Sequence, residues 1–163
     1  MTDDPIRDAL HMMHYGFYSI TSRRGDEVNA MVANWITQAS FSPRLIVFAV
    51  AKKARSHDLI IEGKVMGINI FKKANKDTIL QFSRSSAKDP DKMEGAEYAE
   101  GPETGVPLLK GASAHIECRV KDVLDIGGDH TLIVAEPVSG QVVEEVDAAD
   151  TMSVPDTGWS YAG

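Results

Sequence analysis

The stretch Ser113-Ala-His-Ile-Glu-Cys-Arg-Val-Lys121 alternates polar and apolar side chains at every position. In an extended chain, Ala114, Ile116, Cys118 and Val120 fall on one face and the polar residues fall on the other. This period of two is typical of a β-strand that packs one face on a core and leaves the other in water. The stretch therefore predicts a mainly β protein in which Cys118 is a core residue.

Further strand patterns lie on both sides of this segment. Residues 44–51 have the apolar centre Leu45-Ile-Val-Phe-Ala-Val50, which predicts a central strand covered on both faces. The other predicted strands are Tyr15–Ser22, Glu27–Asn34, Val65–Phe71, Thr131–Val138 and Gln141–Val146. Hairpin turns such as Arg23–Asp26 and Gly127–Asp129 join several of them. About seven short strands joined in this way predict an antiparallel barrel.

Short helices are expected to interrupt the strands. Pro5–Met13 predicts an N-terminal helix that caps the core, Ser56–Glu62 a second helix that ends at Gly63, and Asn75 the cap of a third. The stretch 83–105 is rich in Ser, Asp, Gly and Pro and is interpreted as an ordered, lid-like loop. No break in composition divides the chain, so residues 1–163 are expected to form one domain.

Composition and charge exclude several classes of protein. Hydrophobic residues make up 43% of the 163 positions and charged residues 25%, as in a folded globular chain. The 17 Lys and Arg against 24 Asp and Glu give a net charge of −7, which disfavours nucleic-acid binding. The longest apolar run, residues 45–51, is far short of the ~20 residues that span a bilayer. With a single cysteine and no signal-peptide pattern at the start, the chain is expected in a reducing cytoplasm, away from membranes.

A phosphate site is indicated by Lys52-Lys-Ala-Arg-Ser-His57, which lies between a predicted strand and a predicted helix. Lys53, Arg55 and Ser56 offer cations and a hydroxyl beside the unpaired N–H groups of a helix N-terminus. In an otherwise acidic chain this local positive charge favours a phosphomonoester. The alternative is a solvated surface loop, and the spacing alone does not separate the two.

Three other segments carry candidate ligand-binding groups. Residues 34–41 mix amide, hydroxyl and aromatic side chains that suit the edge and face of a planar heteroaromatic ring, although Trp35 and Phe41 are also plausible core residues. Residues 82–89 form a polar cluster with embedded cations that either covers a phosphorylated ligand or is a solvated loop. His130 stands at a strand entrance, where it contacts a substrate or serves as a structural turn residue.

Other familiar chemistries lack their motifs. The sequence contains no Walker loop and no G-x-G-x-x-G fingerprint after a strand, so neither an NTPase nor a Rossmann fold is indicated. His11 and His14 are three residues apart, but no Cys or carboxylate pair completes a zinc site, and we predict no metal.

Five segments, taken together and in order, resemble the flavin reductase-like family of FMN-binding split barrels. They are Asn29–Pro43, Lys53–Ile60, Phe82–Lys92, Gly105–Ala112 with Glu117–Val120, and Gly128–Glu136. The resemblance covers residues 15–138. It implies a Greek-key split barrel that works as a homodimer with FMN near the subunit interface. The expected activity is an NAD(P)H:flavin oxidoreductase that passes hydride from nicotinamide to flavin N5, with FMN, FAD or riboflavin as the flavin.

The resemblance also assigns site residues. Asn34, Trp35, Ile36 and Thr37 match the segment along the flavin ring and ribityl chain, with Ser40 close by. Lys53, Ser56 and His57 match the phosphate side, to which the motif adds Arg55, and Phe82, Ser83 and Arg84 border the pocket. His130 matches a residue near the flavin or the nicotinamide, the candidate catalytic position.

Some positions depart from the family pattern and leave alternatives open. Arg44 replaces the second proline of a usual Pro-Pro pair, and Tyr161-Ala-Gly163 resembles a Tyr-Gly-Gly tail. A non-enzymatic, flavoredoxin-like FMN electron carrier fits the same fold and phosphate site, whereas a pyridoxamine-phosphate-oxidase-like enzyme fits residues 34–43 less well. The choice between NADH and NADPH, and the acceptor protein or oxygenase that takes the electrons, is left open.

Overall fold

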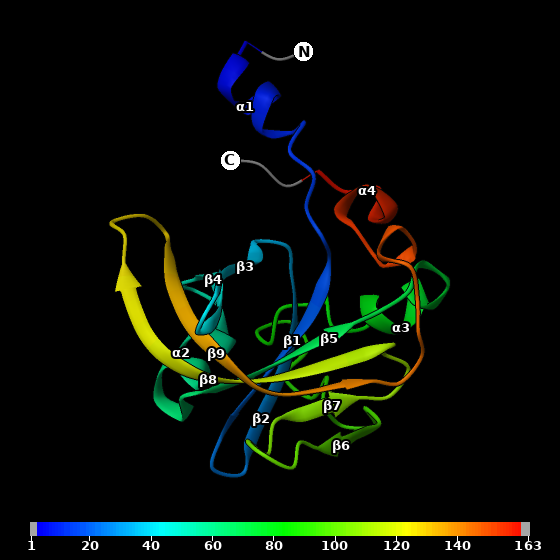
Figure 1. The fold of residues 1–163 in the computed structure, drawn as a ribbon. Coiled ribbons are helices and arrows are strands. Elements are labelled where there is room, and N and C mark those ends of the chain that lie inside the picture. Colours follow the sequence, from blue (N-terminus) through cyan, green and yellow to red (C-terminus); the bar gives the residue numbers. More distant parts are fainter. Residues whose placement is uncertain (1–2, 161–163) are drawn as a thin grey trace.

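A seven-stranded antiparallel sheet forms the frame of the protein (Figure 1). The computed structural model describes residues 3–160, so the Tyr161–Gly163 tail lies outside the described residues. The strand order is β2-β1-β5-β8-β9-β4-β3. The bounds are β1 (Tyr18–Arg24), β2 (Glu27–Ala33), β3 (Ile36–Phe41), β4 (Arg44–Ala51), β5 (Val65–Ile70), β8 (Ala114–Asp125) and β9 (His130–Val142). A separate pair is formed by β6 (Tyr98–Glu100) and β7 (Pro107–Leu109).

Helices are short and lie outside the sheet. They are α1 (Pro5–Leu10), α2 (Arg55–Gly63), α3 (Lys76–Leu80) and α4 (Val154–Thr157), with 3-10 turns η1 (Lys73–Asn75) and η2 (Ala148–Asp150). The prediction of a mainly antiparallel β fold with short helical insertions is confirmed.

Two apolar clusters hold these elements together. The larger cluster collects buried side chains from six of the seven sheet strands and from α2, among them Ile20, Phe48, Ile60, Met66 and Ile133. Because strands from both halves of the sheet contribute to it, the sheet must curve around this cluster, as Figure 1 shows for the long β8 and β9. The second cluster fills the opposite face under α3 and β7 and includes Phe17, Phe71, Ile79 and Met152.

The strand at residues 113–121, most of which belongs to β8, follows its predicted pattern only at Cys118. Ala114, Ile116 and Val120 are only partly buried, and Ser113, His115 and Glu117, which were expected to face water, are buried. Cys118 is completely buried. On the opposite face, Glu117 is also buried because its carboxylate accepts hydrogen bonds from the backbone N–H groups of Glu103 and Thr104, at 3.1 and 2.8 Å, and from the Thr104 hydroxyl. The polar face is therefore covered by the 101–106 loop at this point and is not open to water.

The hairpin prediction at the start of the sheet is confirmed. β1 and β2 pair from Tyr18 with Ala33 to Arg24 with Glu27, which leaves Gly25 and Asp26 as a two-residue loop. Gly25 has φ +59°, the left-handed backbone that such a tight hairpin turn requires.

Two strand predictions are wrong. Residues 36–41 form β3, although their mixed polar and aromatic sequence predicts a segment between strands. The expected break at Ser139-Gly140 does not occur, because β9 runs without interruption to Val142. The strand contains a β-bulge just before these two residues. Cys118 pairs with Pro137 and Glu117 pairs with Ser139, which leaves Val138 without a partner residue on β8.

The predicted coverage of β4 is also corrected. The strand lies next to the edge strand β3 instead of at the centre of the sheet. Ile46, Phe48 and Val50 are buried, but the alternate residues are only partly buried, so one face packs on the core and the other remains open.

Two helix predictions and one loop prediction need correction. The N-terminal helix ends at Leu10, not Met13, and none of its residues is buried, so it projects from the sheet and does not cap the core (Figure 1). Asn75 precedes α3, but its side chain donates to the Gly111 carbonyl at 2.7 Å and does not cap the helix. The lid-like loop is not fully irregular, because β6 lies within it.

Candidate functional site

A basic cavity of about 450 Å³ lies where β2, the start of α2 and the segment 82–92 meet. Helix α2 begins after Ala54, which has an extended backbone and offers no side-chain cap. The His57 N–H donates to the Ala54 carbonyl at 3.0 Å, whereas the N–H groups of Arg55 and Ser56 have no partner within the helix. A ligand in this cavity would face these donors together with the side chains of Lys53, Arg55 and Ser56.

The cations of this cavity differ in whether they form a salt bridge with a carboxylate. Lys52 pairs with Asp125 at 3.0 Å and Arg55 pairs with Glu27. Lys53, Arg84 and Lys92 also line the cavity, and none of them forms a salt bridge with residues 3–160. Burial lowers the pKa of Lys92, and the positive charge of Arg55 acts in the same direction against the opposing effect of Asp89. An anion in the cavity would relieve this excess of positive charge.

A second cavity of about 270 Å³ is lined mainly by aromatic and apolar groups. Trp35 and His130 form one side, with ring centroids 4.8 Å apart and ring planes inclined by 53°. Trp159, next to α4, forms another part of the lining. Its ring packs edge-on against Phe17, with the ring centroids 5.9 Å apart. These flat side chains suit the face of a planar ring.

Asn34 gives this aromatic cavity an unsatisfied donor. Its side-chain nitrogen is buried and has no hydrogen-bond partner among the described residues. A buried amide without a partner costs free energy, which an acceptor on a bound ligand would recover.

The two cavities adjoin. Met31, Val32 and Ser83 line both of them, so β2 and the residue after Phe82 form their common wall. Together they make one site with a cationic end at α2 and an aromatic end at Trp35. This shape matches a ligand that carries a phosphate on one side and a flat heteroaromatic ring on the other.

Most predicted site residues meet at this joined site. Lys53, Arg55, Ser56, Phe82, Ser83 and Arg84 line the basic cavity, and Asn34, Trp35, Ser83 and His130 line the aromatic cavity. Phe82 is also a core side chain with 2% exposure.

Four predicted residues lie elsewhere. Ile36 and Thr37 line a third cavity, and Ser40 lines neither part of the joined site. His57 does not face the basic cavity, because its ring bonds Asp58 and the Thr131 hydroxyl, both at 2.9 Å.

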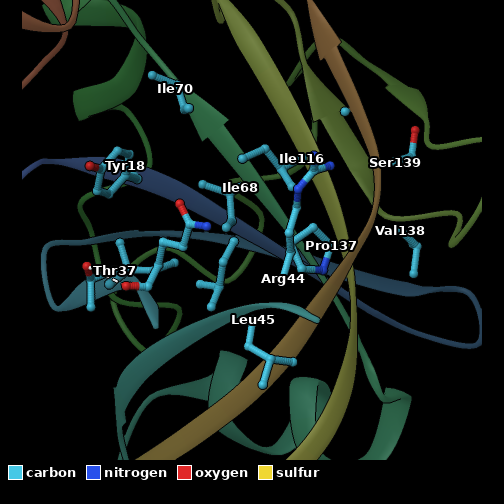
Figure 2. A pocket seen from close by; sticks show the side chains of 14 residues that line it. Tyr18, Thr37, Arg44, Leu45, Ile68, Ile70, Ile116, Pro137, Val138 and Ser139 are labelled. Carbon is cyan, nitrogen blue, oxygen red and sulfur yellow. Dashed lines mark hydrogen bonds between the residues drawn. The ribbon is translucent and has the colours of Figure 1, made fainter. Parts of the chain in front are cut away.

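The third cavity, of about 560 Å³, opens on the other side of β3 and β4. Figure 2 shows Ile68, Ile70 and Ile116 in its lining, with Arg44 among them. It is the largest of these cavities and is mostly apolar, with no cluster of cations.

Sequence reasoning missed several lining residues. Asn29, Lys92 and the apolar pair Met31 and Val32 line the site, as does Trp159. Asn29 and Lys92 stand at the ends of two segments already singled out, but only the fold shows that they face the same cavity.

Metal and membrane features are absent from the described part of the chain. No group of three or more His, Cys, Asp or Glu side chains within residues 3–160 is arranged to hold a metal ion. None of the helices in this range has the length and apolar character needed to cross a bilayer.

The antiparallel β fold and the joined site are those expected of a flavin-binding protein, and the comparison with known families agrees with this. Residues 10–155 match the family described as "Flavin reductase like domain". The chain belongs to this flavin reductase-like family.

Solved structures with this fold include two informative relatives. The NADH:FAD oxidoreductase SgcE6 from Streptomyces globisporus superposes with a TM-score of 0.77 at 26% identity, over 87% of each chain. An FMN-binding protein from Thermus thermophilus gives a TM-score of 0.76 at 26% identity, over 92% of this chain and 83% of that one.

Longer relatives carry the same domain. Diflavin flavoprotein A 1 from a Synechocystis strain is 28% identical over 143 residues, which is 87% of this chain but 25% of the relative. The chain spans about a quarter of the length of the diflavin flavoproteins that it matches.

Proposed function

We propose that the protein is an NAD(P)H-dependent flavin reductase. The observation that carries this proposal is the joined site, in which unpaired cations and the start of α2 adjoin a cavity with Trp35 and an unsatisfied Asn34 amide. Membership of the flavin reductase-like family and the NADH:FAD oxidoreductase activity of the relative SgcE6 support it.

The donors that line the joined site fit the chemical groups of FMN. Lys53, Ser56 and the first N–H groups of α2 would hold the phosphate, and Asn34 would donate to a polar edge of the ring. When bound, the flavin accepts a hydride from reduced nicotinamide. The chain itself supplies binding, alignment of the ring against Trp35 and exclusion of water.

His130 is proposed to contact the nicotinamide side of the site. Its ring packs against Trp35 and receives orientation from Asp129, whose carboxylate lies 2.7 Å from Nδ1. The hydrogen bond to His130 lowers the pKa of Asp129, so this carboxylate stays ionised beside the ring.

We further propose that the protein forms a homodimer with the site near the subunit interface. The mostly apolar third cavity adjoins the β3–β4 hairpin, whose Phe41 is 89% exposed. Large exposed apolar side chains beside an apolar cleft are characteristic of protein contacts. An oxygenase or another electron acceptor is the proposed user of the reduced flavin, and the reducing cytoplasm is the proposed compartment.

Absorbance at the nicotinamide band tests the activity. Purified protein is expected to consume NADH or NADPH under air when FMN, FAD or riboflavin is added. If neither nicotinamide is consumed with any flavin, the reductase proposal is wrong. FMN retained through gel filtration and reduced only by a partner protein would instead support the electron carrier.

The phosphate end of the site has its own test. Ser56→Ala and Lys53→Glu are expected to weaken FMN binding by about tenfold or more and to change riboflavin binding little, because only FMN carries a phosphate. Lys64→Glu, on the exposed end of α2, is the matched charge-reversal control. Equal losses for both flavins would place the phosphate elsewhere.

A further inference from the structure

Asn29 joins three elements around the basic cavity. It lies on β2, is 4% exposed and lines the cavity wall. Its side-chain nitrogen donates to the Ser56 hydroxyl oxygen at 2.9 Å, in the first turn of α2. Its side-chain oxygen accepts from the Ser86 hydroxyl at 3.3 Å, on the segment 82–92. The amide therefore bridges the helix and the loop.

The direction of these hydrogen bonds decides what Ser56 can do. A serine hydroxyl has one hydrogen to donate, whereas an amide nitrogen donates and does not accept. Because Ser56 receives a hydrogen bond from Asn29, its own hydrogen remains for another acceptor. Among residues 3–160 no acceptor takes that hydrogen, and Ser56 lines the cavity whose cations favour an anion.

The segment 82–92, which Asn29 contacts through Ser86, also contributes the cation Lys92 to the basic cavity. Lys92 donates to the Arg84 carbonyl at 3.0 Å, and both residues line the cavity with Ser86. An anion that binds both Lys92 and Ser56 would therefore contact the segment 82–92 and helix α2 at the same time. Asn29 lies between these two elements.

We propose that Asn29 is a positioning residue for the ligand phosphate. It turns the Ser56 hydroxyl into a donor toward the phosphate and couples phosphate binding to the order of the segment 82–92. This inference rests on the proposed function, because it takes the phosphate of a flavin mononucleotide as the anion in the basic cavity.

A double-mutant cycle tests the positioning role. Asn29→Leu removes the amide while keeping the branched shape of the side chain, and Ser56→Ala removes the hydroxyl on which it is proposed to act. The measured quantity is the ratio of FMN to riboflavin affinity, obtained from quenching of flavin fluorescence. We expect each single variant to lower this ratio about tenfold and the double variant to lower it no further than Ser56→Ala alone.

Ser22→Ala is the matched control. Ser22 lies opposite Asn29 in the β1–β2 pairing, and its buried hydroxyl has no partner among the described residues. Removing it changes the same region of the sheet without breaking the bridge, so the affinity ratio should not move.

The outcomes separate this inference from the proposed function. If Ser56→Ala lowers the ratio and Asn29→Leu does not, or if the two losses multiply, Asn29 has no positioning role and the phosphate site stands. If Ser56→Ala itself leaves the ratio unchanged, the phosphate lies elsewhere and both proposals are overturned.

The unaltered protein provides a second measurement in case the leucine variant does not fold. Hydrogen exchange in residues 84–89 is expected to slow when FMN binds and to stay unchanged when riboflavin binds, because only the phosphate engages the bridge. Ser86→Ala should abolish this difference while FMN still binds. Equal protection by both flavins would contradict the coupling between phosphate and loop.

Discussion

The buried surroundings of Cys118 determine the protonation state of its thiol. Its side chain is completely buried, and burial, helped by the negative charge of Glu117, raises the pKa of the thiol to about 12. The neutral thiol is therefore kept in the folded protein over the whole physiological range, and the reactive thiolate forms only after unfolding.

This residue gives a direct prediction. A thiol reagent at pH 8 should label the native protein at least about a hundredfold more slowly than the protein unfolded in guanidinium, because labelling requires both exposure and the thiolate. The time course of labelling checks this at several denaturant concentrations. Fast labelling of native protein would contradict the burial of the strand that defines the fold.

At the scale of elements, the small helix α4 closes one side of the aromatic cavity through Val154 and Thr157. Its start is held by a capping box, in which the Ser153 N–H donates to the Asp156 carboxylate at 2.9 Å and the Ser153 hydroxyl donates to it at 2.6 Å. These bonds lower the pKa of Asp156 below its usual range.

The capping box predicts a pH dependence with a definite sign. Because the folded-state pKa of Asp156 is lowered, the cap is fully formed above the ordinary aspartate pKa and is lost as pH falls through the lowered value. Ser153→Ala should cost about 1 kcal/mol at neutral pH and less in acid. Urea unfolding at pH 7 and pH 3 measures both values, and a loss that is the same or larger at pH 3 would contradict the role of the carboxylate.

Elements also show what the sequence could and could not predict. The β1–β2 hairpin was predictable, because the apolar residues and the Gly25 turn are local signals. β3 was not, because Thr37, Gln38 and Ala39 are exposed on an edge strand and need no apolar alternation. β9 was cut short because Ser139-Gly140 resembles a turn, yet the bulge opposite Cys118 lets the strand continue.

The same limit applies to the candidate site. The charge cluster at residues 52–57 follows from local composition and marks the basic cavity correctly in space. The orientation of each side chain cannot be predicted from local composition, because it depends on partners far along the chain. His57 turns to Thr131, and Asn29 turns to Ser56 and Ser86, contacts that span 74, 27 and 57 positions.

At the scale of the whole molecule, the apolar third cavity and the exposed hairpin tip remain to be explained. Phe41 is 89% exposed at the β3–β4 turn, while the cavity beside this hairpin is lined by Ile68, Ile70 and Ile116. Leaving such surface in water is unfavourable by about 25 cal/mol per Å² of apolar area. A second copy of the chain that covers both features would remove this cost, which is the physical basis of the proposed homodimer.

A single charge should therefore break the assembly. Phe41→Lys places an ammonium in the proposed interface, where desolvation without a partner is costly, so the dimer dissociation constant should rise by about a hundredfold or more. Ile126→Lys, at a similarly exposed position on the β8–β9 turn with 62% exposure, is the matched control and should leave association unchanged. Sedimentation velocity over a range of protein concentrations measures the association of both variants and the parent. A parent protein that sediments as a monomer at every concentration, or a Phe41→Lys variant that dimerises like the parent, would show that the hairpin tip and the apolar cavity are not the subunit interface.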